Sequence, residues 1–140
     1  TPMQWDESAN AGFTTGTPWI RCNPNYTMIN AREAMADEDS IFRYYQKLIR
    51  LRKKESILTE GRYMPLLEED ENIFAYTRET EDEKLLVLCN FRGEEVSYEL
   101  PERWKEGQVL ISNYQEEGVF GTLRPYEAKM VIIRKGDIQE

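Results

Sequence analysis

Leu85-Leu86-Val87-Leu88-Cys89 and Met130-Val131-Ile132-Ile133 are two apolar runs that no polar residue interrupts. A strand with one solvated face alternates apolar and polar side chains, so these unbroken runs predict strands that are covered on both faces. One cover is expected to be an opposing sheet. The second is the helical segment that precedes them, or whatever that segment belongs to.

The pattern around these two runs is that of a β domain. From about residue 57 onward the apolar period is two, and Gly, Asn, Asp or Pro interrupts the pattern about every ten residues. The expected strands are residues 61–67, 73–79, 84–91, 95–100, 108–112, a short piece near Val119, and 128–134. Short strands separated by turns predict a mainly β fold class, with an antiparallel β-sandwich preceded by a loop and a helix.

Two helices are predicted before the strands. Asn30 and Glu33 have the spacing of a capping box, which predicts a short helix ending at about Ala36. Acidic and hydroxyl residues at 37–40 then precede apolar residues at helical spacing through Lys54, which predicts the main helix. Its apolar and aromatic side chains exceed one face, so it is expected to pack between two neighbours.

The first twenty residues, TPMQWDESANAGFTTGTPWI, have neither a helical nor a strand period. They hold Trp5, Phe13 and Trp19 among Gly, Pro, Thr and Asn residues. A long ordered loop that carries aromatic side chains is usually functional, and it needs a rigid body to lie on. Because the chain opens at Thr1 without an initiator Met or a leader, we expect it to be a piece of a larger enzyme.

Composition excludes several classes of function. The 140 residues include 26 acidic and 18 basic ones, and a net charge of -8 repels nucleic acid. No apolar run approaches the ~18 residues of a membrane span. The chain has no His, which excludes a Ser-His-Asp triad and His-based acid–base chemistry within it. No metal and no cofactor is expected.

Cys22 and Cys89 lie far apart in the sequence, without the spacing of a zinc site. A disulfide between them is one alternative. Free thiols are the preferred interpretation, because Cys22 falls in a loop and Cys89 in an apolar strand. Reduced cysteines fit a cytoplasmic protein.

Several specific stretches carry a resemblance to a known family. They are Thr-Pro-Met-Gln-Trp-Asp at 1–6, Ala-Gly-Phe-Thr-Thr-Gly at 11–16, Pro-Trp-Ile at 18–20, Asn-Pro-Asn-Tyr at 23–26, Ala-Asp-Glu-Asp-Ser-Ile-Phe at 36–42, Tyr-Tyr-Gln-Lys-Leu-Ile-Arg-Leu-Arg-Lys at 44–53, and Leu-Arg-Pro-Tyr-Glu-Ala at 123–128. The chain resembles the C-terminal end of the oligo-1,6-glucosidase type of α-glucosidase in glycoside hydrolase family 13. The resemblance is densest over residues 1–54 and looser in the strand region.

The resemblance implies a division at about residue 55. Residues 1–55 would be the eighth βα loop and helix eight of a truncated (β/α)₈ barrel, and 56–140 the family's C-terminal Greek-key sandwich. The family's catalytic carboxylates and glucose-contacting arginines would lie upstream, so no catalytic residue is assigned here. The expected partners are the remainder of the barrel and, only through the full-length enzyme, an oligosaccharide.

Gln4, Trp5 and Asp6 are the candidate substrate-binding residues, as groups at the active-site rim. Asp6 and Glu7 are the loop's acidic pair, but adjacent residues rarely converge on one bond, so capping or solvent exposure is preferred to catalysis. The loop aromatics either form a sugar platform or, the preferred alternative, fix the loop to the barrel.

The alternative function is a free-standing carbohydrate-binding or interaction module. Its candidate aromatics are Tyr63, Tyr98, Trp104 and Tyr114, of which Trp104 is expected in a loop. Packing is the commoner fate of strand aromatics. We also expect the isolated chain either to self-associate or to have a mobile N-terminal region, because side chains such as Trp19 and Phe42 would lack barrel partners.

Overall fold

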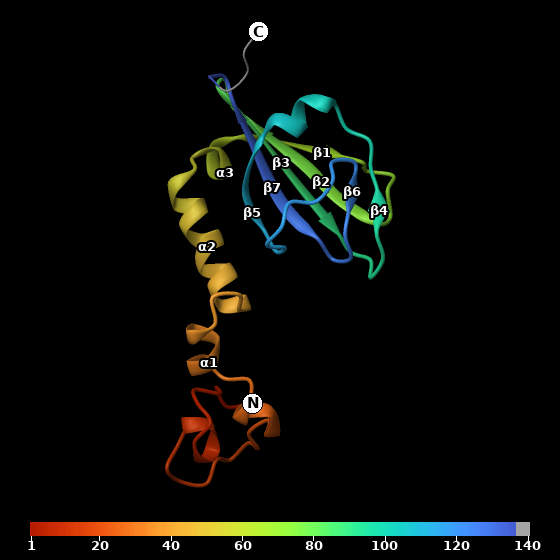
Figure 1. Cartoon of the computed structure of the whole chain (residues 1–140). Coiled ribbons are helices and arrows are strands. Elements are labelled where there is room, and N and C mark those ends of the chain that lie inside the picture. The colour runs from red at the N-terminus through yellow and green to blue at the C-terminus, as the bar shows by residue number, and fades with distance from the viewer. Residues whose placement is uncertain (137–140) are drawn as a thin grey trace. The chain divides into compact units, whose positions relative to one another are not determined.

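The computed structural model describes residues 1–136 and divides the chain into two units, residues 1–47 and 48–140 (Figure 1). The expected sandwich range, 56–140, therefore includes four final residues that lie outside the described ones. None of the helices in the described part has both the length and the apolar character that a bilayer crossing requires.

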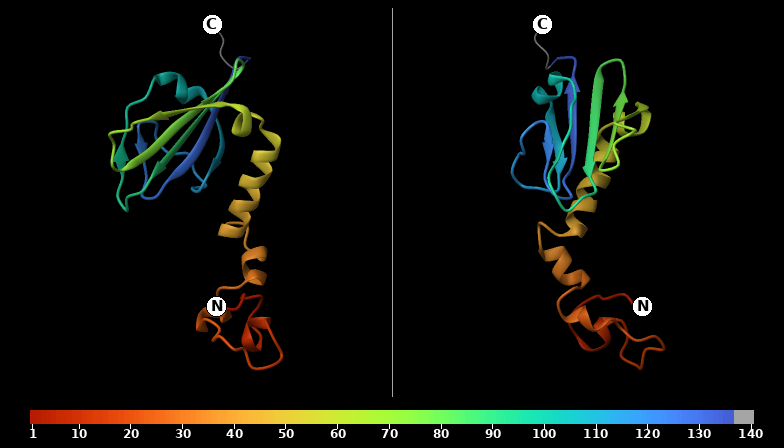
Figure 2. Two further views of the ribbon diagram at one scale, coloured as in Figure 1. Left: turned by 180° about the vertical axis from the view of Figure 1, so that it is seen from behind. Right: turned by 90° about the vertical axis from the view of Figure 1, so that its right-hand side faces the viewer.

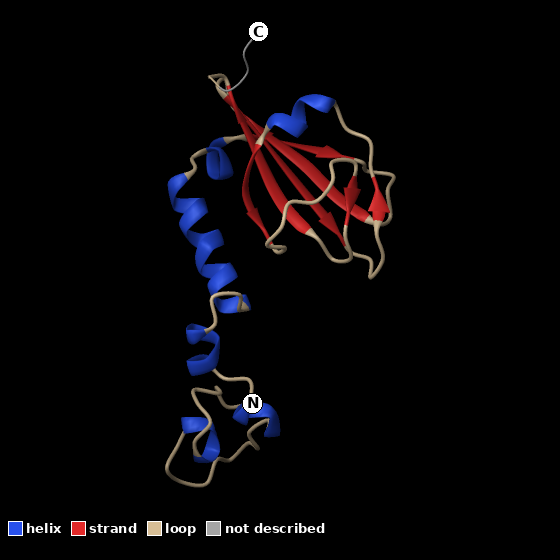
Figure 3. Ribbon diagram, viewed as in Figure 1, coloured by secondary structure: helices blue, strands red, loops and turns tan. Residues whose placement is uncertain are grey.

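The first unit contains short helical elements and no strand among its described residues (Figure 3). They are η1 (Ala9–Gly12), η2 (Pro24–Thr27), α1 (Ala31–Ala36) and the first half of α2 (Ile41–Lys54). The expected cap is present, since the Asn30 side chain accepts a hydrogen bond from the Glu33 N–H at 3.0 Å. Both predicted helices are confirmed, although no residue of α2 is buried.

The second unit carries all the strands, in two antiparallel sheets. The strands are β1 (Arg62–Leu66), β2 (Ile73–Glu79), β3 (Glu83–Asn90), β4 (Val96–Ser97), β5 (Gln108–Ser112), β6 (Thr122–Leu123) and β7 (Ala128–Arg134), with α3 (Ile57–Glu60) and the turn η3 (Glu102–Glu106). The larger sheet has the order β1-β2-β3-β7-β5, and β4 pairs with β6 (Figures 1 and 2). The predicted antiparallel β-sandwich is confirmed.

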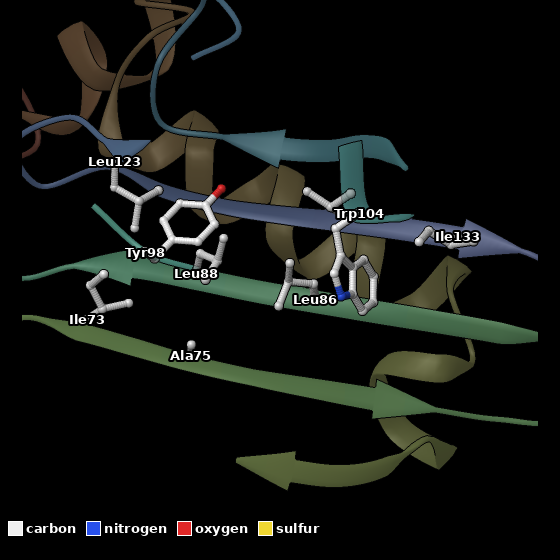
Figure 4. Close-up of a cluster of buried hydrophobic side chains, with 9 residues drawn as sticks. Ile73, Ala75, Leu86, Leu88, Tyr98, Trp104, Leu123 and Ile133 are labelled. Carbon is white, nitrogen blue, oxygen red and sulfur yellow. The ribbon is translucent and has the colours of Figure 1, made fainter. Parts of the chain in front are cut away.

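The two apolar runs lie at the centre of the larger sheet, and both of its faces are covered. On one face, Leu86 and Leu88 contribute to a buried cluster with Tyr98, Trp104 and other side chains (Figure 4). On the other face, a second buried cluster contains Leu85 together with Ile57 and Leu58 of α3, and Leu51 packs against it. The even and odd positions of β3 therefore serve different cores, which explains the missing alternation.

Three expectations about the strand region were wrong. The strand expected at 95–100 is only Val96–Ser97, because the chain turns toward Pro101 and η3. The piece expected near Val119 is Thr122–Leu123, since Val119 lies in a turn and accepts a hydrogen bond from the Thr122 N–H. Residues 57–60 form a helical turn, α3, where no helix was expected.

A polar corner lies between β6 and β7. Glu127 is 1% exposed, and its carboxylate accepts hydrogen bonds from the Arg124 side chain at 3.0 and 3.1 Å and from the Arg124 N–H at 2.9 Å. The buried Asn90 amide donates to the carbonyl oxygens of Glu94 and Arg124, at 2.8 Å each. This corner gives a structural reason for the Arg-Pro-Tyr-Glu stretch, in which Tyr126 has a φ of 54°.

Candidate functional site

The N-terminal loop folds back on itself through backbone hydrogen bonds. The Trp5 and Asp6 N–H groups both donate to the Ala11 carbonyl, at 2.9 and 3.3 Å. Asn10, Ala11 and Gly12 all have positive φ, at 55°, 59° and 65°. A Cβ at Gly12 would lie 2.7 Å from the Asp6 Oδ1 atom, so this tight reversal requires glycine there.

Gln4 joins the loop to the segments that follow it. Its amide nitrogen donates to the Asn25 side-chain oxygen at 3.0 Å and to the Ile29 carbonyl at 2.5 Å. Its own carbonyl accepts a hydrogen bond from the Ala31 N–H at 2.9 Å. Gln4 therefore fixes the loop against η2 and the start of α1.

Asp6 is held ionised by its surroundings. Its Oδ1 atom accepts hydrogen bonds from the Ser8 N–H, at 2.9 Å, and from the Ser8 hydroxyl, and Arg32 contacts Oδ2 at 2.9 Å. The Ser8 hydrogen bonds, and then the Arg32 charge, lower the pKa of Asp6 below its ordinary value. The same guanidinium pairs with Glu7 at 2.7 Å. A general acid needs a raised pKa, so this arrangement favours pairing over catalysis.

The three aromatic side chains of the loop face outward. Trp5 is 53% exposed and Trp19 is 90% exposed, while Phe13 is partly exposed. Among the described residues, none of the close ring pairs involves these three. Their faces are available either to a sugar ring or to another part of a protein, so both alternatives for them stay open.

Sequence reasoning missed two residues on which the loop depends. Arg32, in the first turn of α1, pairs with both loop carboxylates. The sequence shows an acidic pair and a basic residue, but it does not show that they lie close together. Asn10 donates to the Thr14 and Gly16 carbonyls at 3.2 and 3.0 Å. Its place in an Asn-Ala-Gly sequence signalled a turn without identifying these partners.

The four candidate aromatic residues of the second unit do not form one surface. Trp104 is 4% exposed and lies in η3, which turns its ring toward the core, so the expected place in a loop was wrong and the ring belongs to no surface platform. Tyr98 is also buried, and the Tyr114 hydroxyl donates to the Pro125 carbonyl. Tyr63 is exposed and packs against Tyr76, with ring centroids 5.1 Å apart.

Neither a disulfide nor a metal site is found in the described part of the chain. Cys22 and Cys89 are free thiols, as predicted. Burial raises the pKa of the Cys89 thiol, which makes it less reactive. Within residues 1–136, no group of three or more His, Cys, Asp or Glu side chains has an arrangement that could hold a metal ion.

Two protein-family models match the chain in succession. Residues 1–61 match the alpha amylase catalytic domain, and residues 73–128 match the alpha-amylase SusG C-terminal domain. The first match contains the aromatic loop, α1 and α2. The second contains most of the sandwich.

Individual relatives match nearly the whole chain. The oligo-1,6-glucosidase of Bacillus cereus is 53% identical over 133 residues, which cover 91% of this chain and 24% of that protein. That of Heyndrickxia coagulans is 47% identical over 136 residues, covering 96% and 24%. The crystal structure of Bacillus licheniformis trehalose-6-phosphate hydrolase superposes with a TM-score of 0.89 at 45% identity, covering 96% of this chain and 26% of that one.

The chain thus spans about a quarter of the length of the relatives it matches. A catalytic-domain segment comes first in the chain and a C-terminal domain follows it. The fold is that of the trehalose-6-phosphate hydrolase over the matched residues. The chain belongs to the α-amylase family, glycoside hydrolase family 13, and corresponds to the C-terminal part of an oligo-1,6-glucosidase-like member.

Proposed function

We propose that this chain is the non-catalytic C-terminal portion of an α-glucosidase that hydrolyses terminal α-1,6 or related α-glucosidic bonds of short oligosaccharides. The supporting observation is the match of 91% of the chain to an oligo-1,6-glucosidase at 53% identity. A retaining mechanism needs two carboxylates roughly 5 Å apart. We place both in the catalytic domain upstream of residue 1.

The substrate of the whole enzyme stays a choice among related glucosides. Relatives of similar identity are named as oligo-1,6-glucosidases and as a trehalose-6-phosphate hydrolase. Isomaltose, dextran ends, trehalose-6-phosphate and sucrose all carry an α-glucosyl group that such a site could accept. We take α-1,6-linked oligosaccharides as the first choice.

We propose two roles for the chain within that enzyme. Residues 1–6 complete the active-site rim, with Trp5 as the group nearest to substrate and with Gln4 and Asp6 holding it in place. The sandwich, which begins at residue 56, stabilises the barrel to which residues 1–55 belong. Exposed rings on the β1-β2 side of the large sheet, Tyr63, Phe74 and Phe91, are the surface that we expect to pack on it.

A chimeric enzyme tests the proposal. The matching C-terminal quarter of the Bacillus cereus oligo-1,6-glucosidase is replaced by residues 1–140, and hydrolysis of isomaltose is compared with that of the parent and of a truncated parent. We expect the chimera to retain activity and the truncated form and the isolated chain to have none. Turnover by the purified 140-residue chain would disprove the assignment, as would a folded but inactive chimera.

The rim residues are tested in the same chimera. Trp5→Ala is expected to raise KM for isomaltose by about tenfold, the order of effect of losing one aromatic contact. Trp19→Ala, at a still more exposed Trp of the same loop, is the control. Equal effects of the two substitutions would remove the special role of Trp5.

Two further properties follow from the proposal. We place the enzyme in the cytoplasm, because both cysteines are free and reduced thiols persist there. We expect the isolated chain to self-associate or to lose its N-terminal region to protease, since Trp19, Ile41 and Tyr45 are exposed. Sedimentation and limited proteolysis check this, and a protease-resistant monomer contradicts it.

A further inference from the structure

The second unit contains a cavity of about 360 Å³ on the side of the large sheet that carries the Trp104 cluster. Leu86, Leu88 and Val131 line it from the sheet, and Tyr98, Trp104 and Phe120 line it from the covering segments. A volume of about 300–1,000 Å³ is usual for a small-molecule site. The cavity lies wholly within residues 86–131, apart from the aromatic loop.

One buried polar group that lines this cavity has no partner. Tyr98 is 6% exposed, and its hydroxyl makes no hydrogen bond in the described part of the chain. Burial raises the pKa of the phenol, against a smaller lowering by the Gly121 backbone. Because buried hydroxyls are almost always hydrogen-bonded, a hydroxyl without a partner among residues 1–136 points to a ligand as its partner.

A cation and an anion lie near the Tyr98 side chain. The Lys129 side chain is 11% exposed, its ammonium lies 3.8 Å from the Glu127 carboxylate, and it is 5.9 Å from the centre of the Tyr98 ring. Burial lowers the pKa of Lys129. Arg124 already binds both Glu127 oxygens, so the ammonium keeps donor capacity toward the cavity.

The charge balance of the lining points to a neutral ligand. Lys105 is paired with Glu102 at 2.7 Å, and the rim adds the carboxylates of Glu116 and Glu117. An anion would meet these carboxylates, and a cation would meet Lys129. A molecule with many hydroxyl groups and an apolar ring face suits the aromatic walls, the donor Lys129 and the hydroxyl of Tyr98 together.

We propose that this cavity is a non-catalytic binding site for a neutral mono- or disaccharide, with Tyr98 and Lys129 as its hydrogen-bonding residues. The inference does not rest on the proposed function, since it uses no residue of the aromatic loop and no catalytic group. It also differs from a surface platform, because its aromatic groups form walls.

NMR titration of the 140-residue chain with isomaltose and with glucose tests the proposal. We expect saturable shifts in amides of residues 86–131. Tyr98→Phe is expected to weaken binding about tenfold, the effect of losing one buried hydrogen bond. Because that hydroxyl has no partner in the described part of the chain, the variant is expected to keep its fold and its melting temperature. Tyr63→Phe is the matched control, because Tyr63 is exposed and packs against Tyr76, and it is expected to bind as wild type does.

Lys129→Met provides an independent variant that retains the aliphatic stem of the side chain, and it is also expected to weaken binding. Three results overturn the proposal: the absence of saturable binding at millimolar sugar, unchanged affinity in Tyr98→Phe, or shifts with inorganic phosphate and none with sugar. The first would leave the cavity to water alone. None of these results bears on the chimeric enzyme, so the two proposals fail separately.

Discussion

Different forces stabilise the two units, residues 1–47 and residues 48–136. In the first unit only Ala11 and Asn30 are buried, and its order comes from hydrogen bonds and ion pairs between residues as far apart as Asp6 and Arg32. In the second unit two apolar clusters line the two faces of one sheet. A folded loop without a core needs a neighbouring surface for its apolar side chains, whereas the sandwich has a core of its own.

The contrast has an energetic basis. A typical hydrogen bond adds only about 1 kcal/mol net to stability, and an exposed ion pair about 0–1 kcal/mol. A fully buried Leu or Ile contributes about 1.5–3 kcal/mol through apolar burial. Polar contacts can therefore define the shape of the first unit, but apolar burial is what resists unfolding in the second.

The largest effect is expected from a cavity in the sandwich core. Leu86 is 1% exposed and lies in the middle of β3, so Leu86→Ala should destabilise the second unit by about 2–5 kcal/mol. Urea denaturation followed by circular dichroism measures this. Val119→Ala, at a position that is 75% exposed, is the control and should change stability by less than about 0.5 kcal/mol. Equal effects would mean that the cluster is not the core.

An intermediate and pH-dependent effect is expected at Glu127. Burial raises the pKa of Glu127. The hydrogen bonds from Arg124 and the charge of Lys129 together lower it by more, so the net shift is downward. A lowered folded-state pKa stabilises the protein above the unfolded pKa, and this stability is lost as pH falls through the folded pKa.

Glu127→Gln should therefore cost roughly 1–3 kcal/mol at neutral pH, where it removes the charge that Arg124 and Lys129 face. The variant should lose less stability than wild type between neutral pH and acid. Thermal unfolding at a series of pH values checks both points, with the exposed Glu95→Gln as control. Parallel pH profiles for wild type and Glu127→Gln would refute the assignment.

A smaller, local effect is expected in the first unit. Gly12→Ala places a methyl group against the Asp6 carboxylate at a φ of 65°, which costs about 1–3 kcal/mol of strain. Hydrogen exchange at the Trp5 and Asp6 amides should accelerate, while the strands of the second unit exchange as before. At Gly16 a Cβ would meet only the Thr14 hydroxyl at 3.7 Å, so Gly16→Ala is the matched control.

The two units also differ in how well the sequence predicts them. Strands 73–79, 108–112 and 128–134 were predicted with the observed bounds, because apolar period and turn residues report local burial directly. The strand expected at 95–100 is short because its pairing with β6 ends at Ser97. The Tyr98 N–H still donates to the Gly121 carbonyl, and the chain then turns toward Pro101. Pattern alone does not reveal where pairing ends.

The candidate site was less predictable for a physical reason. Gln4, Trp5 and Asp6 stand out by composition, but their structural roles come from Asn25, Ile29 and Arg32, which lie more than twenty residues away. No local period encodes such polar pairings. The cavity beside Tyr98 was equally hidden, since it depends on how segments from separate strands meet.

The smallest effect concerns which neighbour sets the charge of Asp6. The lowered pKa of this carboxyl comes first from the Ser8 hydroxyl and N–H, and the Arg32 charge is a lesser cause. The Arg32 side chain is 57% exposed, so solvent screens both of its pairings. NMR titration should therefore show a larger rise of the Asp6 pKa in Ser8→Ala than in Arg32→Met, and added salt should change only the Arg32 contribution. The reverse order would mean that the ion pair, and not the turn, organises this loop.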